Sequence, residues 1–413
     1  MSILNLRSHK AALGFIFVTA VLDVISMGLV IPVLPSLIEE FAGSNAAAGI
    51  WNGAFVAMWA AMQFIASPVI GSLSDQYGRR PVILLSCAGM AADWVLMALA
   101  PSLWWLAVGR LLGGLTSSSF TTIYAYMADI TAPEKRARAY GLIGAAFSGG
   151  FVLGPVLGGF LGEYDARLPF WAAAALSAAA FVYGAVVLPE SLPPEKRMRF
   201  SWRRANPVGA MVLLLRHREL TGLSIVNFLL YFAHHVFSAV FVLYAAYRYG
   251  WGPREVGFLL AMVGLLDMAV QGVVIGPVVK RLGDRGTMIL GLFGGALGVA
   301  MMGWAPTGLM FALAMLPNAL WGLAMPTIQS LMTRQVSESE QGQLQGANMS
   351  VASVAGVMSP LFFGWVYSIS VGQGTAPAVS GFAFYIAGAI LLAAAVIGWV
   401  VARRAERSEA AAA

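Results

Sequence analysis

Twelve long apolar runs, separated by short polar links, constrain this chain more than any other feature of its sequence. A helix needs about 20 apolar residues to cross a bilayer core of about 30 Å. The runs lie at about 11–38, 48–70, 82–100, 103–128, 138–161, 168–188, 219–247, 255–279, 287–304, 307–331, 343–367 and 380–402. Only 11% of the residues are charged, against about 25% in ordinary soluble domains. The sequence therefore predicts an all-helical integral membrane protein with twelve transmembrane helices.

The basic residues indicate the side of the membrane on which each loop lies. When the N-terminus and every second loop are placed on one side, that side holds 21 of the 25 Lys and Arg residues. The opposite loops hold three, and Arg110 lies inside a span. Because cytoplasmic loops are enriched in Lys and Arg, both termini are expected in the cytoplasm. The net charge of +6 then reflects topology, and we expect no nucleic-acid partner.

The two halves of the chain repeat one another. A shift of 205 residues carries five Gly or Pro positions of the first half onto identical residues in the second. These are Gly71, Gly78, Gly141, Pro155 and Gly159, which match Gly276, Gly283, Gly346, Pro360 and Gly364. Such a repeat predicts two six-helix bundles, at 1–188 and 219–413, with a site between them near the midplane. The basic linker 189–218 fits either an interfacial helix on anionic lipid or a plain solvated connector.

A short polar loop follows the second span, and it holds six residues at a fixed spacing. They are Gly71, Leu73, Asp75, Gly78, Arg79 and Arg80. The loop resembles the signature Gly-x-Leu-x-Asp-x-x-Gly-Arg-Arg of the major facilitator superfamily, and every fixed position is filled. In the second half Lys280 stands where Asp75 stands in the first, so the second copy departs from the signature.

The resemblance gives this loop an expected role. By the geometry of the superfamily, Asp129 at the cytoplasmic end of span four lies near the loop arginines. We therefore expect an ion-pair latch among Asp75, Arg79, Arg80 and Asp129 that holds the outward-facing state. The alternative is that the arginines act only on membrane topology.

Span five carries small residues at a specific spacing. They are Gly141, Gly150, Gly154, Pro155, Gly158 and Gly159. This pattern resembles the antiporter signature of drug–proton exchangers. A face of small residues with a proline break suits close packing and bending of a membrane helix.

Within the superfamily the sequence is most similar to the tetracycline-efflux branch, from about residue 12 to 370. The supporting stretches are 28–35, 109–115, 154–160 and 334–346. The resemblance implies proton-coupled export of tetracycline or a related amphipathic drug across the bacterial inner membrane by alternating access. It implies no cofactor beyond the proton gradient, and a drug that can arrive as a divalent-metal complex. Because one chain holds both halves, we expect a functional monomer with a small molecule, protons and the bilayer as partners.

Two positions depart from that branch. Asp267 stands where span eight of the branch often carries a histidine, and Gly294 and Gly295 stand where span nine carries an aspartate. In the branch that carboxylate is tied to handling the metal–tetracycline cation and the proton. The departures keep other functions open: a multidrug or metabolite exporter of the same fold, or a uniporter or symporter.

Four ionisable residues lie deep in the predicted spans: Asp23, Asp93, Arg110 and Asp267. At 1.5 Å per residue, the three Asp residues fall near the midplane. Each such charge costs about 2.5–3.5 kcal/mol to insert, so packing alone would favour Leu or Val. We expect the three carboxylates to face a central cavity and to exchange protons, with Arg110 keeping one of them charged. The alternative is a static buried pair between Arg110 and one Asp.

Polar and sulfur-containing side chains at helical spacing predict a substrate wall. They are Asn52, Trp59, Gln63, Gln271, Asn318, Met325 and Gln329. Aromatic and Met surfaces with a few hydrogen-bonding groups suit bulky planar drugs. Asn and Gln also bond helices to one another in lipid, and that alternative applies to each of these residues.

The sequence also argues against other classes of membrane protein. None of the four Lys residues follows a Gly, so the phosphate-binding Gly-Lys-Ser/Thr motif of ATP-driven pumps is missing. No metal-ligand cluster or nucleophile–base pair is evident, so we predict a secondary transporter and not an enzyme. A sensor or scaffold on the same fold would not need midplane carboxylates.

Overall fold

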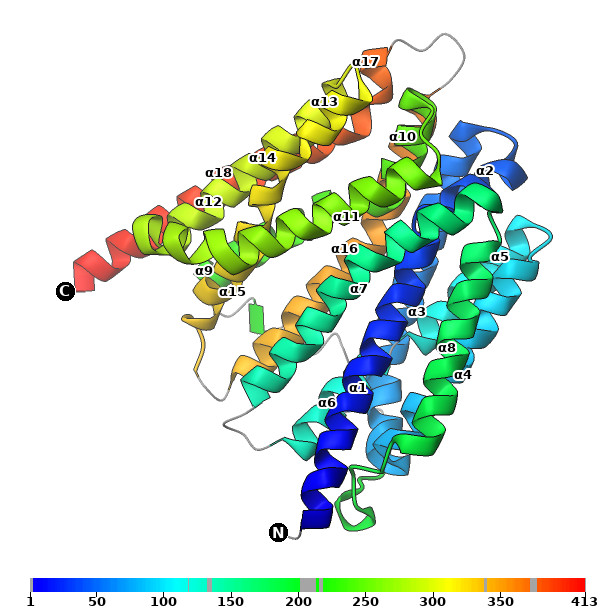
Figure 1. Cartoon of the computed structure of the whole chain (residues 1–413). Coiled ribbons are helices and arrows are strands. Elements are labelled where there is room, and N and C mark those ends of the chain that lie inside the picture. The colour runs from blue at the N-terminus through cyan, green and yellow to red at the C-terminus, as the bar shows by residue number, and fades with distance from the viewer. Residues whose placement is uncertain are drawn as a thin grey trace. The chain divides into compact units, whose positions relative to one another are not determined.

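The computed structural model describes residues 3–117, 119–131, 136–200, 213–214, 218–337, 340–371 and 377–412. Within these ranges all regular structure is helical (Figure 1). Apolar runs of this length leave backbone groups no partner in lipid except those within the same helix. The all-helical prediction is therefore confirmed for the described part of the chain.

The chain divides into two compact units. Unit 1 contains Met1–Phe41, Met58–Asn206 and Gly252–Ala261, and unit 2 contains Ala42–Ala57, Pro207–Trp251 and Met262–Ala413. The helices of unit 1 are α1 (Ile3–Val30), α2 (Leu34–Ala42), most of α3 (Asn45–Tyr77), α4 (Arg79–Leu99), α5 (Leu103–Thr116), α6 (Ser119–Ile130), α7 (Arg136–Tyr164), α8 (Leu168–Val187) and the short η2 (Pro194–Lys196). Inside this unit α1 packs on α7 and α8, and α4 packs on α5 and α8.

Unit 2 is built from more interrupted helices. They are α9 (Arg218–His234), η4 (Phe237–Phe241), α10 (Val242–Tyr249), the second half of α11 (Pro253–Ala269), η5 (Val270–Val274), α12 (Ile275–Trp304), α13 (Gly308–Leu313), α14 (Met315–Ala319), η6 (Leu320–Leu323), α15 (Ala324–Thr333), α16 (Gln341–Ser370), α17 (Pro377–Ser380) and α18 (Phe382–Ala412). Inside this unit α12 packs on α18, and α9 packs on α16 and α18.

The helices are long and apolar enough to cross a membrane many times. Ten segments of the described chain meet that criterion, and Leu103–Thr116 is a shorter apolar helix. The longest segment, Pro253–Trp304, has 52 residues and breaks at Gly283, whose φ is 68°. The sequence places a loop between two spans at this break. The multi-pass membrane fold is confirmed, whereas the number of twelve spans stays a prediction.

Each unit takes one short segment from the part of the chain that otherwise builds the other unit. Residues 42–57 belong to unit 2, and residues 252–261 belong to unit 1. The 205-residue shift carries 42–57 to 247–262, which contains the second segment. The two exchanged segments are thus related by the same shift as the repeated Gly and Pro residues. The predicted boundaries at 188 and 219 stay a prediction, because the units are not continuous in sequence.

The start of the predicted linker lies against unit 1. The backbone N–H of Met198 donates to the carbonyl of Asp75 at 3.0 Å, and that of Phe200 donates to Gln76 Oε1 at 3.2 Å. Residues 201–212 and 215–217, including Trp202, lie outside the described residues. The predicted interfacial helix concerns these residues, so it stays a prediction.

Candidate functional site

Asp93 and Arg110 form a buried charge pair inside unit 1. Asp93 lies on α4 with none of its surface exposed, and Arg110 lies on α5 with 9% exposed. Arg110 Nη2 lies 3.6 Å from Asp93 Oδ2, and the guanidinium sits 5.5 Å from the centre of the Trp94 ring. Among the described residues both Asp93 oxygens lack a hydrogen-bond partner. The pair is therefore held by charge and by packing, and both Asp93 oxygens can still accept hydrogen bonds.

Small residues on α5 make room for this carboxylate. A Cβ placed on Gly109 would lie 2.9 Å from Asp93 Oδ1, and one on Gly113 would lie 2.5 Å from Asp93 Oδ2. Two glycines one helical turn apart thus form a notch that receives the Asp93 side chain. Trp59 of α3 packs beside Gly113 and Gly114.

Asp23 is the second deeply buried carboxylate of unit 1. It lies on α1 with 5% of its surface exposed, and its Oδ1 has no hydrogen-bond partner in the described chain. No cation among the described residues lies within ion-pairing distance of Asp23. Arg110 is therefore paired with Asp93, whereas Asp23 has no counter-charge in the described part of the chain.

Asp267 lies in unit 2 and has a different environment. It is exposed near the end of α11, and it accepts a hydrogen bond from Gln271 Nε2 at 2.7 Å. Gln271 belongs to η5, which follows α11 directly. The structure therefore brings these two predicted residues together, one from the proton-coupling set and one from the substrate wall.

The predicted residues of α3 fall on both sides of the division between the units. Asn52 is buried in unit 2, where its Nδ2 donates to the carbonyls of Ser238 and Ala239 at 3.1 and 2.7 Å. These carbonyls belong to the π-helical turn η4. Gln63 lies in unit 1 and donates to Ser117 Oγ at 3.4 Å. The contacts of Asn52 match the helix-bonding alternative more closely than a ligand contact.

The predicted residues of span ten differ in what they contact. Asn318 is buried on α14 against Gly298 of α12, so it packs between helices. Met325 of α15 has 42% of its surface exposed and accepts a hydrogen bond from the Tyr231 hydroxyl at 3.6 Å. Gln329 Oε1 accepts from Asn348 Nδ2 at 2.9 Å. Met325 is the member of this set with the most free surface.

The polar loop after α3 centres on Arg79. Its Nη1 lies 2.6 Å from Asp75 Oδ1, and its Nε lies 3.1 Å from Asp129 Oδ2. Gly78 precedes it with a φ of 105°, a backbone conformation that side chains disfavour. Gly71, one of the loop glycines, lies in open space on α3. The guanidinium of Arg80 donates instead to the carbonyl of Ala185 at 2.8 Å, so Arg80 lies outside the ion-pair group.

Glu190, which follows α8, also contacts this loop and is not among the residues predicted from the sequence. Its carboxylate accepts from the backbone N–H groups of Arg79 at 2.8 Å and Arg80 at 3.2 Å. These are the first two residues of α4, so Glu190 caps a helix N-terminus that prefers negative charge. Ser191 Oγ donates to Asp129 Oδ2 at 3.1 Å. The only sequence signal for this cap is an acidic residue just after span six.

The small residues of α7 allow two close helix contacts inside unit 1. A Cβ on Gly154 would lie 2.7 Å from the Cα of Gly28 on α1, and Gly150 and Gly158 face the same helix. On another side, a Cβ on Gly159 would lie 2.6 Å from the carbonyl oxygen of Pro253. Pro155 lies inside α7 between these contacts. Gly141 lies in α7, but its surroundings fall outside the described part.

The sequence of the chain matches the family model of the Major Facilitator Superfamily over residues 16–360 and 223–413. The chain belongs to the Major Facilitator Superfamily. It is therefore a membrane transporter for a small molecule and not an enzyme.

Relatives place it more narrowly within this superfamily. It is 37% identical to the tetracycline resistance protein, class C, of Escherichia coli, over 87% of this chain and 90% of the relative. It is 36% identical to the class G protein of Vibrio anguillarum, over 85% of this chain and 89% of the relative. It belongs to the same family as these proteins.

The fold agrees with this assignment. The crystal structure of the nucleoside transporter NupG matches with a TM-score of 0.78 at 13% identity, and the match covers 94% of this chain and 98% of that one. The predicted superfamily, its tetracycline-resistance branch and its fold are thus confirmed.

Gly294 and Gly295, which stand where the resemblance predicts a carboxylate in span nine, lie in a closely packed part of unit 2. A Cβ on Gly294 would lie 2.6 Å from Leu320 Cβ, and one on Gly295 would lie 3.0 Å from the Trp321 ring. Both glycines of α12 therefore lie in close contact with η6. An acidic side chain at either position would have to displace that helix.

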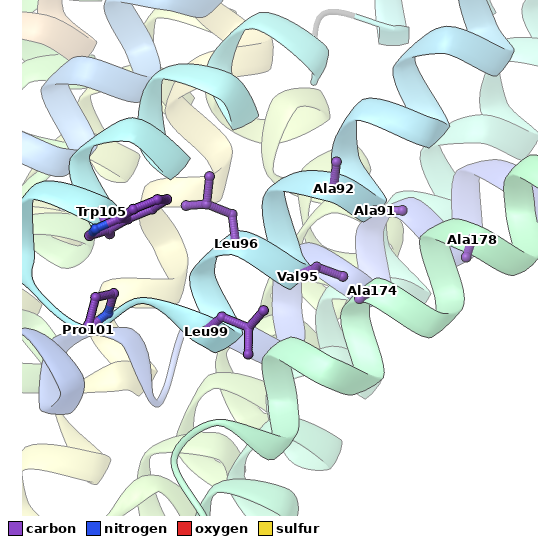
Figure 2. Close-up of a pocket in the computed structure, with 9 residues that line it drawn as sticks. All are labelled: Ala91, Ala92, Val95, Leu96, Leu99, Pro101, Trp105, Ala174 and Ala178. Atoms are coloured by element: carbon purple, nitrogen blue, oxygen red, sulfur yellow. The ribbon is translucent and has the colours of Figure 1, made fainter.

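An apolar groove lies on another face of unit 1 (Figure 2). Its volume is about 650 Å³, and its lining comes from α4, α5, α8 and the loop between α4 and α5. The lining residues are Ala91, Ala92, Val95, Leu96, Leu99, Pro101, Trp105, Ala174 and Ala178. None of the predicted site residues lines it, and a groove of this composition suits hydrocarbon.

Proposed function

We propose that this transporter exports tetracycline or a closely related amphipathic drug in exchange for protons, by alternating access. The observation that carries the cargo is the 37% identity to a tetracycline resistance protein over 87% of the chain. The span-five pattern of small residues, which resembles the antiporter signature, supports exchange as the mode of coupling.

The buried carboxylates of unit 1 supply the proton-coupling groups. Asp23 has no counter-charge among the described residues, so its neutral form is favoured by burial and its charged form needs water or substrate. Asp93 has Arg110 beside it, which stabilises its carboxylate while that group is unprotonated. A drug that carries positive charge, alone or as a divalent-metal complex, competes with protons for these carboxylates. Asp267 is the carboxylate that unit 2 contributes to this set, although it is exposed and does not match Asp23 or Asp93 in the repeat.

The remaining parts of the proposal concern the cell and the cycle. The excess of Lys and Arg on one set of loops supports cytoplasmic termini and insertion into the bacterial inner membrane. The ion pairs of Arg79 with Asp75 and Asp129 support a latch that biases one conformation of the cycle. A single chain carries both repeats, which supports a functional monomer.

The direct test is drug susceptibility of a pump-deficient bacterial strain that expresses this chain. Tetracycline is compared with a panel of unrelated cationic and neutral drugs. Everted membrane vesicles then report uptake of tetracycline with and without an uncoupler. We expect resistance to tetracycline and uptake that collapses with the uncoupler; resistance confined to other drugs contradicts the cargo, and uptake that ignores the uncoupler contradicts proton coupling.

Substitutions separate the roles of the carboxylates. Asp23→Asn, Asp93→Asn and Asp267→Asn are each expected to reduce proton-driven uptake while the protein still reaches the membrane. Asp165→Asn is the matched control, because Asp165 lies in a loop and Asn retains the oxygen that accepts from the N–H of Arg167. Normal uptake in any one of the three variants removes that residue from the proton-coupling set.

A second cargo is favoured by one specific observation. The carboxylate of span nine, which the resemblance ties to the metal–tetracycline cation, is replaced by Gly294 and Gly295, and η6 fills the space. This favours a related exporter whose cargo carries no metal ion. Export of tetracycline that does not depend on added Mg²⁺ would support it.

A further inference from the structure

The repeat carries three charged residues of the first loop and its ion-pair group onto charged residues of opposite sign, while Arg80 falls on Arg285 and keeps its sign. The shift of 205 residues takes Asp75 to Lys280, Arg79 to Asp284, and Asp129 to Arg334. The glycine before each central residue is kept, because Gly78 becomes Gly283. Three charges inverted together at one constant shift differ from the loss of a motif, in which charges would be replaced by neutral residues.

The structure shows that the inverted residues meet. In unit 2 the guanidinium of Arg334 forms an ion pair with Asp284 Oδ2. In unit 1 the corresponding contact is between Arg79 Nε and Asp129 Oδ2, at 3.1 Å. In unit 1 the pair joins the start of α4 to the end of α6. In unit 2 it joins the part of α12 that begins after Gly283 to the end of α15. The second loop departs from the signature in its residues, yet its Asp284–Arg334 contact corresponds to the Arg79–Asp129 contact of the first loop.

The buried member of each pair occupies the same position in the repeat, although its charge has the opposite sign in the two units. The side chain after the glycine is the buried one in both units, with 10% exposed for Arg79 and 9% for Asp284. Its partner is more exposed, with 23% for Asp129 and 69% for Arg334. A serine hydroxyl also contacts each buried charge: Ser74 accepts from Arg79 at 2.6 Å, and Ser330 donates to Asp284 at 2.9 Å.

The glycines give both loops the same turn. Gly78 has a φ of 105° and Gly283 has a φ of 68°, and they are two of the four glycines with positive φ in the described chain. A helix begins after each of them. An acid at that point interacts favourably with a helix N-terminus, whereas a base does not. Asp284 fits this preference directly, while Arg79 requires Glu190 to supply the negative charge.

We propose that Asp284 and Arg334 are a charge-inverted second copy of the Arg79–Asp129 pair, and that they position the loop of unit 2 for the transport cycle. This inference rests on the proposed transport function only for its final step. The pair ties the α12 end of the loop to the end of α15, so that this end of unit 2 moves as one body. Both members are positioning residues, since neither belongs to the residues proposed to exchange protons or to contact the drug.

The test uses the full-length protein with one cysteine reporter. Cys87 is replaced by Ala, and Thr287→Cys is introduced, because Thr287 is fully buried on α12 and its hydroxyl donates to Gly283 at 2.7 Å. Maleimide labelling at that position therefore requires the helix end to open. Arg334→Gln is expected to raise the labelling rate about tenfold, within the usual range of coupling between sites, and to abolish most drug export.

Charge exchange then distinguishes a pair from two independent charges. The triple variant Lys280→Asp, Asp284→Arg and Arg334→Asp gives unit 2 the charge order of unit 1, and it is expected to restore slow labelling and most export. Lys280 is changed as well, because it stands where Asp75 stands in unit 1 and would otherwise face the new guanidinium. Exchange of the pair alone in unit 1, Arg79→Asp with Asp129→Arg, is expected to fail. There Asp75, which now pairs with the Arg79 guanidinium at 2.6 Å, would face the new carboxylate. Glu190, which accepts from the backbone N–H of Arg79 at 2.8 Å, would add a second negative charge at the same helix start.

Arg281→Gln is the matched control, because it removes a positive charge from the same loop without altering the pair. The inference is overturned if Arg334→Gln labels at the rate of its parent, or if the triple variant labels as fast as the single one. Labelling does not depend on the cargo. Restored slow labelling in a protein that exports no tetracycline would contradict the proposed cargo and leave this pair in place.

Discussion

Asp23 and Asp93 lie in the same unit and are buried to nearly the same degree, yet their surroundings differ. Asp93 has Arg110 at 3.6 Å and a notch formed by Gly109 and Gly113. Asp23 has neither a cation within ion-pairing distance nor a hydrogen bond to Oδ1 among the described residues. A charged carboxylate without a partner is strongly disfavoured in an apolar interior. Burial alone therefore does not set the role of an acidic residue in a membrane span; the nearest cation does.

This contrast assigns different consequences to the two residues. Removing Asp93 leaves the Arg110 guanidinium buried, whereas removing Asp23 leaves no opposite charge behind. We therefore expect Asp93 to matter both for stability and for coupling, and Asp23 to matter for coupling alone.

The largest effect is expected for Asp93→Leu. The substitution leaves Arg110 buried without its partner, and such a loss typically costs about 3–5 kcal/mol of unfolding free energy. Unfolding of the purified protein in detergent, followed by heat or denaturant, measures it. The double variant with Arg110→Leu should regain most of that stability. A double variant as unstable as Asp93→Leu would show that the pair does not explain the loss.

A smaller effect is expected when the notch is filled. Gly113→Ala places a methyl group against Asp93 Oδ2, and overpacking of this kind costs about 1–3 kcal/mol. Gly149→Ala is the control, because a Cβ there meets nothing within 4 Å. In a helix the control should stabilise by up to about 1 kcal/mol, since Ala has the higher helix propensity. Equal stability of the two variants would argue against a tight notch.

Asp23→Asn should change the unfolding free energy by less than about 1 kcal/mol, because no buried charge loses a partner. The same variant should lose uptake driven by a proton gradient in vesicles while it still exchanges labelled for unlabelled drug. If exchange is lost together with driven uptake, Asp23 contacts the drug and is not restricted to proton coupling.

The finest distinction is chemical. A hydrophobic carbodiimide reacts with carboxyl groups in their protonated form. Because Arg110 lies beside Asp93 and stabilises its charged form, the reagent should modify Asp23 in preference to Asp93. Mass spectrometry of peptides gives the extent of modification at each site. In an Arg110→Leu variant the modification at Asp93 should rise toward that at Asp23. Equal modification of both residues in the parent would remove the contrast.

The sequence predicts those features that depend on local pattern. Apolar runs determine the helices, and the spacing of Gly, Pro and charged residues indicates the family and the loop at Arg79. The depth of Asp93 and Arg110 follows from counting residues along a span. The identity of the Arg110 partner does not, because three carboxylates were available at a similar depth.

The features that escaped prediction are contacts between distant elements. Glu190 caps a helix that begins 111 residues earlier, and no local pattern marks an acidic residue for that role. Asn52 lies on a helix face that fits a substrate wall, but its amide satisfies two carbonyls of η4. A helical wheel gives the direction of a side chain, and the neighbour in that direction comes only from the packed structure.

The exchange of residues 42–57 and 252–261 between the units has a consequence for synthesis of the protein. Unit 1 is complete only after the ribosome has passed residue 261, although most of its helices have been made by residue 206. Until then the face of α7 around Gly159 lacks its contact with Pro253. The first half must therefore reside in the membrane as an unfinished bundle while the start of the second half is inserted, and separately expressed halves would each lack the segment that completes them.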